Sequence, residues 1–124
     1  MKGMNEWWRN FFKSFYYAMT GIIFGFKERN MKIHGLVAVV VVGVGWCLNL
    51  SLVEWSTILI LIGLVFTAEL INTSIEELAN VVKKNNNDDY EVTKTTRNLA
   101  AGAVLVMAMI SAVVGLLIFL PKLL

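Results

Sequence analysis

The sequence predicts an all-α membrane protein in which three transmembrane helices follow an amphipathic helix at the membrane interface. Apolar residues make up 57% of the 124 positions, which exceeds the roughly 45–50% usual in soluble domains. Three apolar stretches, 35–50, 55–78 and 99–120, approach or exceed the roughly 17 to 25 residues that cross the hydrocarbon core. Charged residues gather before the first stretch and between the last two.

The first helix is expected over about residues 5–27, at the membrane surface. Its aromatic residues recur at helical spacing on one side, whereas Arg9 and Lys13 fall on another; the aromatics are Trp7, Trp8, Phe11, Phe12 and Phe15. Aromatic rings are favoured in the headgroup region, so this pattern indicates an interfacial helix. A soluble helix packed on a later loop is the alternative.

The three spans are expected at about residues 33–50, 55–80 and 98–120, all within one domain, 1–124. A polar, turn-favouring run at 85–89 separates the second span from the third. Pro121 is expected to stop the last helix, because proline lacks the backbone N–H that a helix needs.

Basic residues indicate the orientation of the spans. Ten of the eleven Lys and Arg residues lie before the first span or between the second and third: Lys2, Arg9, Lys13, Lys27, Arg29, Lys32, Lys83, Lys84, Lys94 and Arg97. Short basic segments stay in the cytoplasm, so the amino terminus and the 81–98 loop are expected inside. The net charge of +2 is too small to indicate a nucleic-acid partner.

A polar stripe is expected on the second span. Glu69 lies about 21 Å along the helix from Trp55, within the inner part of the hydrocarbon. A carboxylate there costs a few kcal/mol, so it normally faces protein or water and has a function. Four polar side chains project from one sector of this helix about 80° wide: Glu69, Asn72, Glu76 and Asn80.

Three interpretations fit this stripe. Polar side chains can hold helices together by hydrogen bonds, although two Glu and two Asn exceed what adhesion requires. A carboxylate in a membrane can carry protons or cations, as in small transporters. It can also act in catalysis, and the stripe alone does not choose between transport and catalysis.

Neighbouring charges favour catalysis of phosphoryl transfer. Glu28 and Glu76 approach the inner face with carboxylate oxygens, which suit Mg²⁺ shared with nucleotide phosphates. Lys94 and Arg97 can neutralise phosphates. Glu69 lies about 10 Å deeper, where a lipid hydroxyl can meet a base. The sequence contains no GxxxxGK[ST] loop, so a P-loop kinase is excluded.

The sequence resembles the small prokaryotic diacylglycerol kinase family, and most closely its Gram-positive branch, the undecaprenol kinases. Residues 69–76, ELINTSIE, match the pattern E-x-x-N-[ST]-[AS]-I-E, and residues 100–105, AAGAVL, are similar to the start of the family's third span. Residues 11–15, 28–30, 33–34 and 115–122 also resemble the family.

The resemblance implies a lipid kinase in the plasma membrane of a bacterium, a homotrimer with shared active sites that uses ATP and Mg²⁺. The substrate is a membrane lipid alcohol, with undecaprenol favoured over diacylglycerol. By similarity Glu69 is the general base, and Glu28 and Glu76 are the metal ligands. The nucleotide-binding candidates are Lys13, Tyr17, Asn72, Glu76, Lys94, Arg97 and Asn98. Three further residues are candidates to support the site residues or to contact the substrate: Arg9, His34 and Asn80.

Three departures from the family pattern matter. Asn80 stands where the family has Asp, and Arg97-Asn98 stand where it has Lys-Asp. Arg9 is one position further from Phe11 than the corresponding Arg of the Gram-positive branch. The loss of two negative charges motivates an alternative of another class, a catalytically impaired member that binds lipid or partners.

Overall fold

A computed structural model describes the backbone of residues 2–124 and the side chains of residues 3–124. The regular elements in that part are all helical: α1 (Lys2–Gly25), α2 (Arg29–Cys47), α3 (Leu52–Lys84), the 3-10 turn η1 (Tyr90–Val92) and α4 (Lys94–Leu123). Three of them, α2, α3 and α4, are long and apolar enough to cross a membrane. The predicted all-α class and its three candidate spans are therefore confirmed.

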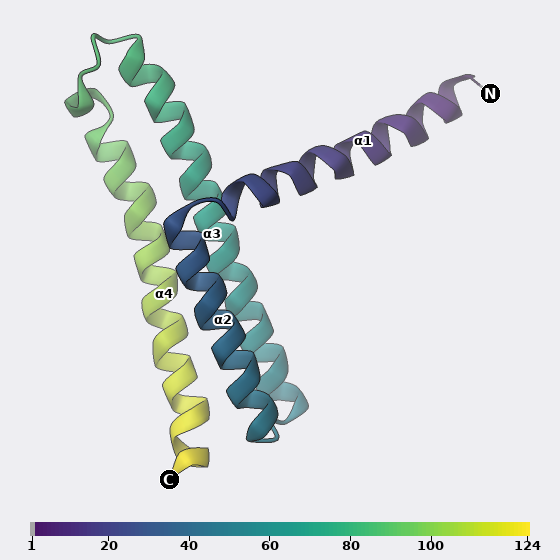
Figure 1. The fold of residues 1–124 in the computed structure, drawn as a ribbon, viewed down its shortest axis with the longest axis vertical. Helices are drawn as coiled ribbons and strands as arrows, with labels where there is room; N and C mark the ends of the chain where they lie inside the picture. Colours follow the sequence, from purple (N-terminus) through teal and green to yellow (C-terminus); the bar gives the residue numbers. More distant parts are fainter. Residues whose placement is uncertain (1) are drawn as a thin grey trace.

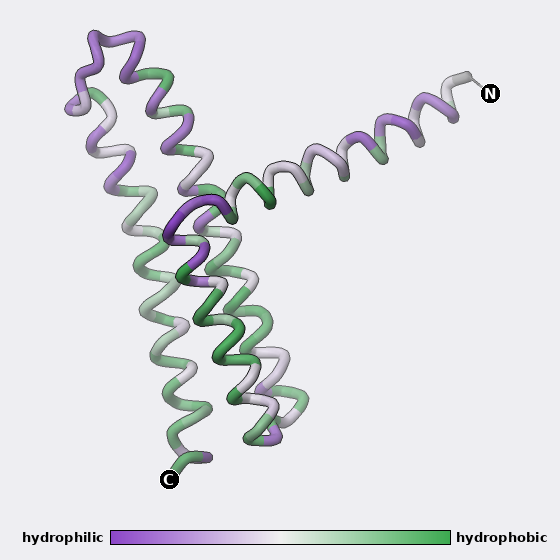
Figure 2. Tube along the Cα trace, viewed as in Figure 1, coloured by the Kyte–Doolittle hydropathy of each residue, from purple (hydrophilic) through white to green (hydrophobic). Residues whose placement is uncertain are grey.

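The bundle is built around the pair formed by α3 and α4. These two helices make the most extensive contact, and α2 packs mainly on α3. Figure 1 shows α2 beside the other two over the half of the bundle away from the α3–α4 connection. In Figure 2 that half is mostly apolar, whereas the α3–α4 connection and much of α1 are hydrophilic. The apolar half is the part suited to the hydrocarbon core.

Helix α1 leaves the bundle at a steep angle, and its amino-terminal end lies far from the other helices (Figure 1). The side chains of residues 3–24 are all exposed. Aromatic rings pack along the helix itself, with centroid distances of 5.6 Å between Trp7 and Phe11 and 5.1 Å between Phe11 and Phe15. The single chain therefore leaves a continuous aromatic face of α1 uncovered.

The corner between α1 and α2 is anchored on α3. Gly25 is buried there, and a Cβ atom at this position would collide with the side chain of Leu70. The rings of Phe26 and Phe66 meet edge to face with centroids 5.6 Å apart, and Met31 is fully buried. The corner therefore lies at the level of Leu70, next to Glu69.

Polar contacts tie α3 to α4 at both ends of the pair. At one end Ser51 and Glu54 form a capping box, and Lys122 Nζ lies 3.2 Å from Glu54 Oε2. At the other end Arg97 Nη2 donates to Asn80 Oδ1 over 2.9 Å. Since these contacts lie at opposite ends, they fix the register of the two helices.

The prediction that Pro121 stops the last helix was wrong, because α4 continues through it to Leu123. Only Lys122 and Leu123 of the helix follow the proline, so its missing N–H removes one hydrogen bond at the very end of α4.

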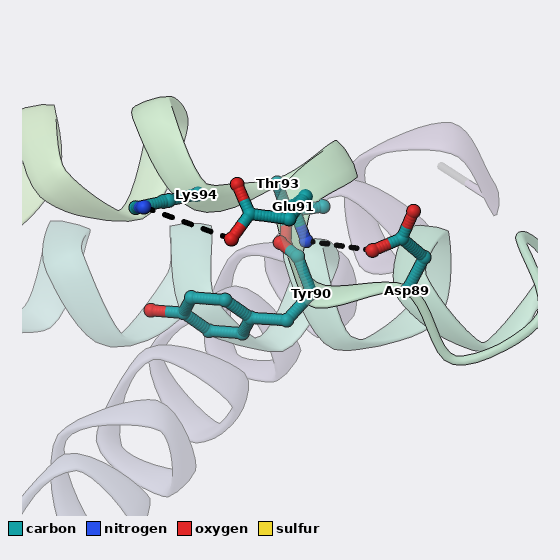
Figure 3. A network of polar contacts seen from close by, with 5 residues as sticks. All are labelled: Asp89, Tyr90, Glu91, Thr93 and Lys94. Atoms are coloured by element: carbon teal, nitrogen blue, oxygen red, sulfur yellow. Dashed lines mark hydrogen bonds and ion pairs between the residues drawn. The ribbon is translucent and has the colours of Figure 1, made fainter.

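A tight connection joins α3 to α4. Asn87 and Asp88 adopt positive φ angles of 58° and 56°, a conformation that Asn and Asp tolerate better than most residues. Figure 3 shows the segment that follows, in which the Glu91 N–H donates to Asp89 Oδ1 over 3.0 Å. Glu91 also pairs with Lys94, with 3.6 Å between Oε1 and Nζ. Lys94 is thereby held at the start of α4.

Candidate active site

The polar stripe of α3 passes from the interior of the bundle to its surface. Glu69 and Asn72 are buried, at 2% and 5% exposed, whereas Glu76 is half-buried and Asn80 is exposed. Ile71, next to this stripe in sequence, is 56% exposed. The two deepest polar residues of the stripe therefore face protein, as a carboxylate in a membrane-spanning helix requires.

Glu69 is paired with His34 of α2. His34 Nε2 lies 3.1 Å from Glu69 Oε1, and the side chains are 22% and 3% exposed, respectively. A buried carboxylate without a partner would be costly, and the imidazole N–H supplies that partner. The sequence marks both residues as candidates, but their pairing depends on how α2 packs against α3.

Asn72 and Glu76 form a second contact on the same stripe. Asn72 Nδ2 donates to Glu76 Oε1 over 3.2 Å. Asn72 Oδ1 is buried and, among the described residues, has no hydrogen-bond partner. A buried acceptor left unpaired costs about 1 to 3 kcal/mol. Asn72 Oδ1 is therefore an unsatisfied acceptor in the buried part of the stripe.

Glu28 and Glu76, the predicted metal ligands, carry the carboxylate oxygens that Mg²⁺ prefers. Glu28 is the N-cap residue of α2, yet its side chain makes no capping hydrogen bond, so its carboxylate is not used by the helix. It is half-buried, three residues after Gly25 in the corner that packs on α3. Residues 3–124 contain no group of three or more metal-binding side chains. Mg²⁺ commonly takes only one or two carboxylates and completes its shell with water and phosphate.

Arg97 already donates hydrogen bonds to other side chains of the chain. It donates from Nη2 to Asn80 Oδ1 and from Nε to Thr93 Oγ1, both over 2.9 Å, and its guanidinium lies 5.2 Å from the centroid of the Tyr90 ring. The neighbouring candidates point to the surface: Lys94 pairs with Glu91, and Asn98 is exposed. The structure thus brings Arg97 to Asn80 but gathers neither Lys94 nor Asn98 around Glu69.

The candidates on α1 remain apart from the buried stripe within one chain. Arg9, Lys13 and Tyr17 are exposed on the helix that leaves the bundle. They do not share a site with Glu69 unless another chain supplies the rest of it.

An apolar groove of about 570 Å³ lies between α2, α3 and α4. Its volume falls in the range usual for ligand pockets. Only two of its lining residues are polar, His34 and Ser111, and Ser111 Oγ has no hydrogen-bond partner among the described residues. The apolar lining comprises Ile33, Val37, Ala38, Val41, Ile58, Leu61, Ile62, Val65, Phe66, Ala108, Ala112, Gly115, Leu116 and Phe119. His34 lines the groove and also contacts Glu69, so the groove and the polar site meet at this residue.

Three candidate spanning helices, with a carboxylate buried where α2 meets α3, define a multi-pass membrane protein with a polar centre inside its bundle. The chain belongs to the prokaryotic diacylglycerol kinase family, whose model matches residues 16–119. The predicted family is therefore confirmed.

Two relatives show how far the similarity extends. The chain is 43% identical to undecaprenol kinase of Bacillus subtilis over 114 residues, which cover 91% of this chain and 90% of that protein. It is 32% identical to diacylglycerol kinase of Synechocystis sp. over 116 residues, 93% of this chain and 65% of that protein. No solved structure matches. The family and both relatives are kinases of membrane lipids, so the predicted lipid kinase class is also confirmed.

Proposed function

We propose that this chain transfers the γ-phosphate of ATP to the hydroxyl of undecaprenol. The observation that carries this proposal is the buried Glu69 carboxylate, held by His34 beside an apolar groove and one turn from Asn72. The 43% identity to a relative named undecaprenol kinase supports it.

The proposed reaction needs a base, a nucleotide site and charge stabilisation. The basic centre around Glu69 takes the hydroxyl proton, the alcohol oxygen forms a bond to the γ-phosphorus, and the bond to the bridging oxygen of ADP breaks. Phosphoryl transfer depends mainly on positioning and electrostatics. Glu28 and Glu76 would hold Mg²⁺, which neutralises charge on the phosphates when bound. Asn72 Oδ1, unpaired in the bundle, would accept a hydrogen bond from the nucleotide side.

The groove supports undecaprenol over diacylglycerol as substrate. A polyprenol carries its hydroxyl directly on a hydrocarbon chain, whereas diacylglycerol brings two ester groups close to the hydroxyl. Buried ester carbonyls lose hydrogen bonds to water and need donors in the site. His34 and Ser111 are the only polar side chains lining the groove, so a plain hydrocarbon fits it better. Its volume holds the first part of such a chain.

We further propose a cytoplasmic amino terminus, α1 at the membrane surface, and a homotrimer with shared sites. The basic residues before α2 and between α3 and α4 support this orientation. The exposed aromatic face of α1 suits the headgroup region. In a trimer, Arg9, Lys13 and Tyr17 of one subunit would reach the nucleotide held by Glu76 of its neighbour.

The experiment offers undecaprenol and diacylglycerol side by side to the purified protein with radiolabelled ATP and Mg²⁺. We expect faster phosphate transfer to undecaprenol and no transfer after chelation of Mg²⁺. Faster transfer to diacylglycerol would support the alternative substrate. Folded protein that transfers phosphate to neither lipid would contradict the proposal.

A catalytically impaired member remains the second candidate, because one contact specifically motivates it. Arg97 meets the neutral amide of Asn80 at a position where the family pattern has a carboxylate. The exposed end of the polar stripe, at Asn80, therefore carries less negative charge than the family pattern predicts.

A further inference from the structure

We propose that His34 is a positioning residue for Glu69, which it holds by one carboxylate oxygen so that the other oxygen is turned to the hydroxyl of the lipid. Glu69 itself is the general base of the proposed reaction. This inference rests on the proposed lipid kinase function and deepens it, because it assigns separate tasks to the two oxygens of the buried carboxylate.

The Glu69 carboxylate has one anchor within the part of the chain that the structure describes. Its Oε1 lies 3.1 Å from His34 Nε2, and no other side chain of residues 3–124 forms an ion pair with it or donates to it. The side chain of Glu69 is only 3% exposed, so water does little to fix its direction. A Glu side chain without such a contact can turn between several rotamers. The donor from α2 selects one of them.

The backbone that carries His34 is fixed at the level of Glu69. Met31, three residues earlier and thus on the same side of α2, is fully buried. Gly25, in the corner that leads into α2, is buried against Leu70, the residue next to Glu69 in sequence. Packing therefore sets the offset of the two helices, and the imidazole reaches the carboxylate from a rigid support. A functional carboxylate is held precisely when the residue behind it is locked by packing in this way.

The imidazole can fill this role without a change in its own protonation. A carboxylate only accepts hydrogen bonds, so Nε2 carries the proton of this contact, as it can in both the neutral and the charged ring. Oε1 of Glu69 is occupied by that donor, which leaves the lone pairs of Oε2 for the substrate. His34 also lines the apolar groove. The carboxylate is therefore held next to the groove that would contain the lipid chain.

The proposed step moves one proton and leaves His34 unchanged. Oε2 of Glu69 takes the hydroxyl proton while the alcohol oxygen forms its bond to the γ-phosphorus. The bond between the γ-phosphorus and the bridging oxygen breaks, and its electrons leave with ADP. Glu69 returns the proton to water once the products dissociate. A general base must lie within about 2.6 to 3.2 Å of the group whose proton it takes, so a carboxylate turned away from the hydroxyl loses most of its effect.

The alternative is a purely structural role, in which the pair only offsets the cost of burying a charge. In that case, loss of the contact lowers stability and leaves the kcat of the folded protein unchanged. Kinetic and stability measurements on the same variants therefore separate the two roles.

The test compares two amides at position 34 in the full-length protein, with undecaprenol and Mg·ATP as substrates. The amide nitrogen of Gln lies as many bonds from the backbone as Nε2 of His, whereas that of Asn lies one bond closer. His34→Gln therefore keeps a donor within reach of Glu69, and His34→Asn does not. Leu36→Ala, at an exposed position of α2 outside the groove, is the control for a change in this helix. Calorimetric ATP binding and thermal unfolding report on folding.

We expect His34→Asn to lower kcat by about 10- to 100-fold, the loss that a displaced catalytic group causes. His34→Gln should keep kcat within about fivefold of the parent value, because the donor is retained. The KM for ATP should stay within about twofold in both variants, since His34 lies on the lipid side. Leu36→Ala should retain the parent kcat. Equal kcat values for the Gln and Asn variants, or a comparable loss in Leu36→Ala, would overturn the inference.

A second measurement asks whether His34 acts through Glu69. In the Glu69→Gln background, which lacks the base, His34→Asn should lower the residual rate by less than about twofold, because residues that act as a unit are not additive. A further loss as large as the one in the parent would overturn the inference, since His34 would then act independently of Glu69. A parent that phosphorylates neither lipid would instead reject the proposed function, and this inference with it.

Discussion

Arg97 of α4 donates a hydrogen bond to Asn80 of α3 over 2.9 Å, and both residues stand at positions where this chain departs from the family pattern. An Asp and a Lys at these positions can form an ion pair. Arg and Asn replace that pair with a charge-assisted hydrogen bond, which needs only one ionised group. The two departures therefore preserve the contact between α3 and α4. They also remove one negative charge from position 80, at the exposed end of the polar stripe.

This contact should couple the two residues energetically. We expect Arg97→Ala and Asn80→Ala each to destabilise the protein, with a coupling of about 0.5 to 1 kcal/mol, because the contact is partly exposed. A double-mutant cycle measured by unfolding in mixed micelles checks this value. Single-variant losses that add fully in the double variant would show that the contact contributes nothing.

Restoring the family's charges tests whether the parent is impaired. We expect the double variant Asn80→Asp, Asn98→Asp to phosphorylate undecaprenol within about fivefold of the parent rate, since an exposed ion pair contributes about 1 kcal/mol or less. The control is the double variant Asn86→Asp, Asn87→Asp, which adds the same two negative charges at exposed positions of the connecting loop. A much larger gain, absent in the control, would support the catalytically impaired alternative.

Two acidic residues of α3, Glu69 and Glu76, should act in the reaction, whereas a third, Glu77, should not. Glu69→Gln is expected to lower kcat at least about 100-fold, because a neutral amide cannot take the proton of the lipid hydroxyl. Glu76→Gln should raise the Mg²⁺ concentration needed for half-maximal rate, because one carboxylate ligand is lost. Glu77→Gln, exposed and adjacent in sequence, should behave as the parent in the same phosphate-transfer assay.

Two glycines of α1 form a matched pair. Gly25→Ala should cost about 1 to 3 kcal/mol and lower the kinase rate, because its Cβ meets Leu70 and displaces the corner that carries Glu28. Gly21→Ala has nothing within 4 Å of the new atom, and it should be neutral or stabilise the helix by up to about 1 kcal/mol. Thermal unfolding and activity are measured for both. Equal behaviour of the two variants would argue against the close packing of the corner.

The far end of α3 should affect stability without affecting catalysis. Ser51→Ala removes a capping box and should cost about 1 kcal/mol. Ser56→Ala, whose hydroxyl only bonds to a carbonyl one turn earlier, should change stability by less than about 0.5 kcal/mol. Both should retain the parent kcat, because neither lies near Glu69. A kcat loss in Ser51→Ala would link this end to the active site.

The sequence by itself determined the helical class, the number of candidate spans and the alignment of Glu69 with Asn72 and Glu76. Apolar length and the helical period are local properties, so each helix reveals its own span and its own polar face. The family motif at 69–76 also lies within one helix. Pro121 was misjudged because its effect depends on how much helix follows it.

Only the tertiary structure decided which helices bring their polar residues together. Neither helix alone specifies that His34 of α2 meets Glu69, or that Arg97 of α4 meets Asn80. Such contacts depend on the rotation and offset of one helix against another, and these follow from packing of side chains such as Leu70 against Gly25. Helical periodicity contains no information about that rotation, so it predicts the candidates but not their partners.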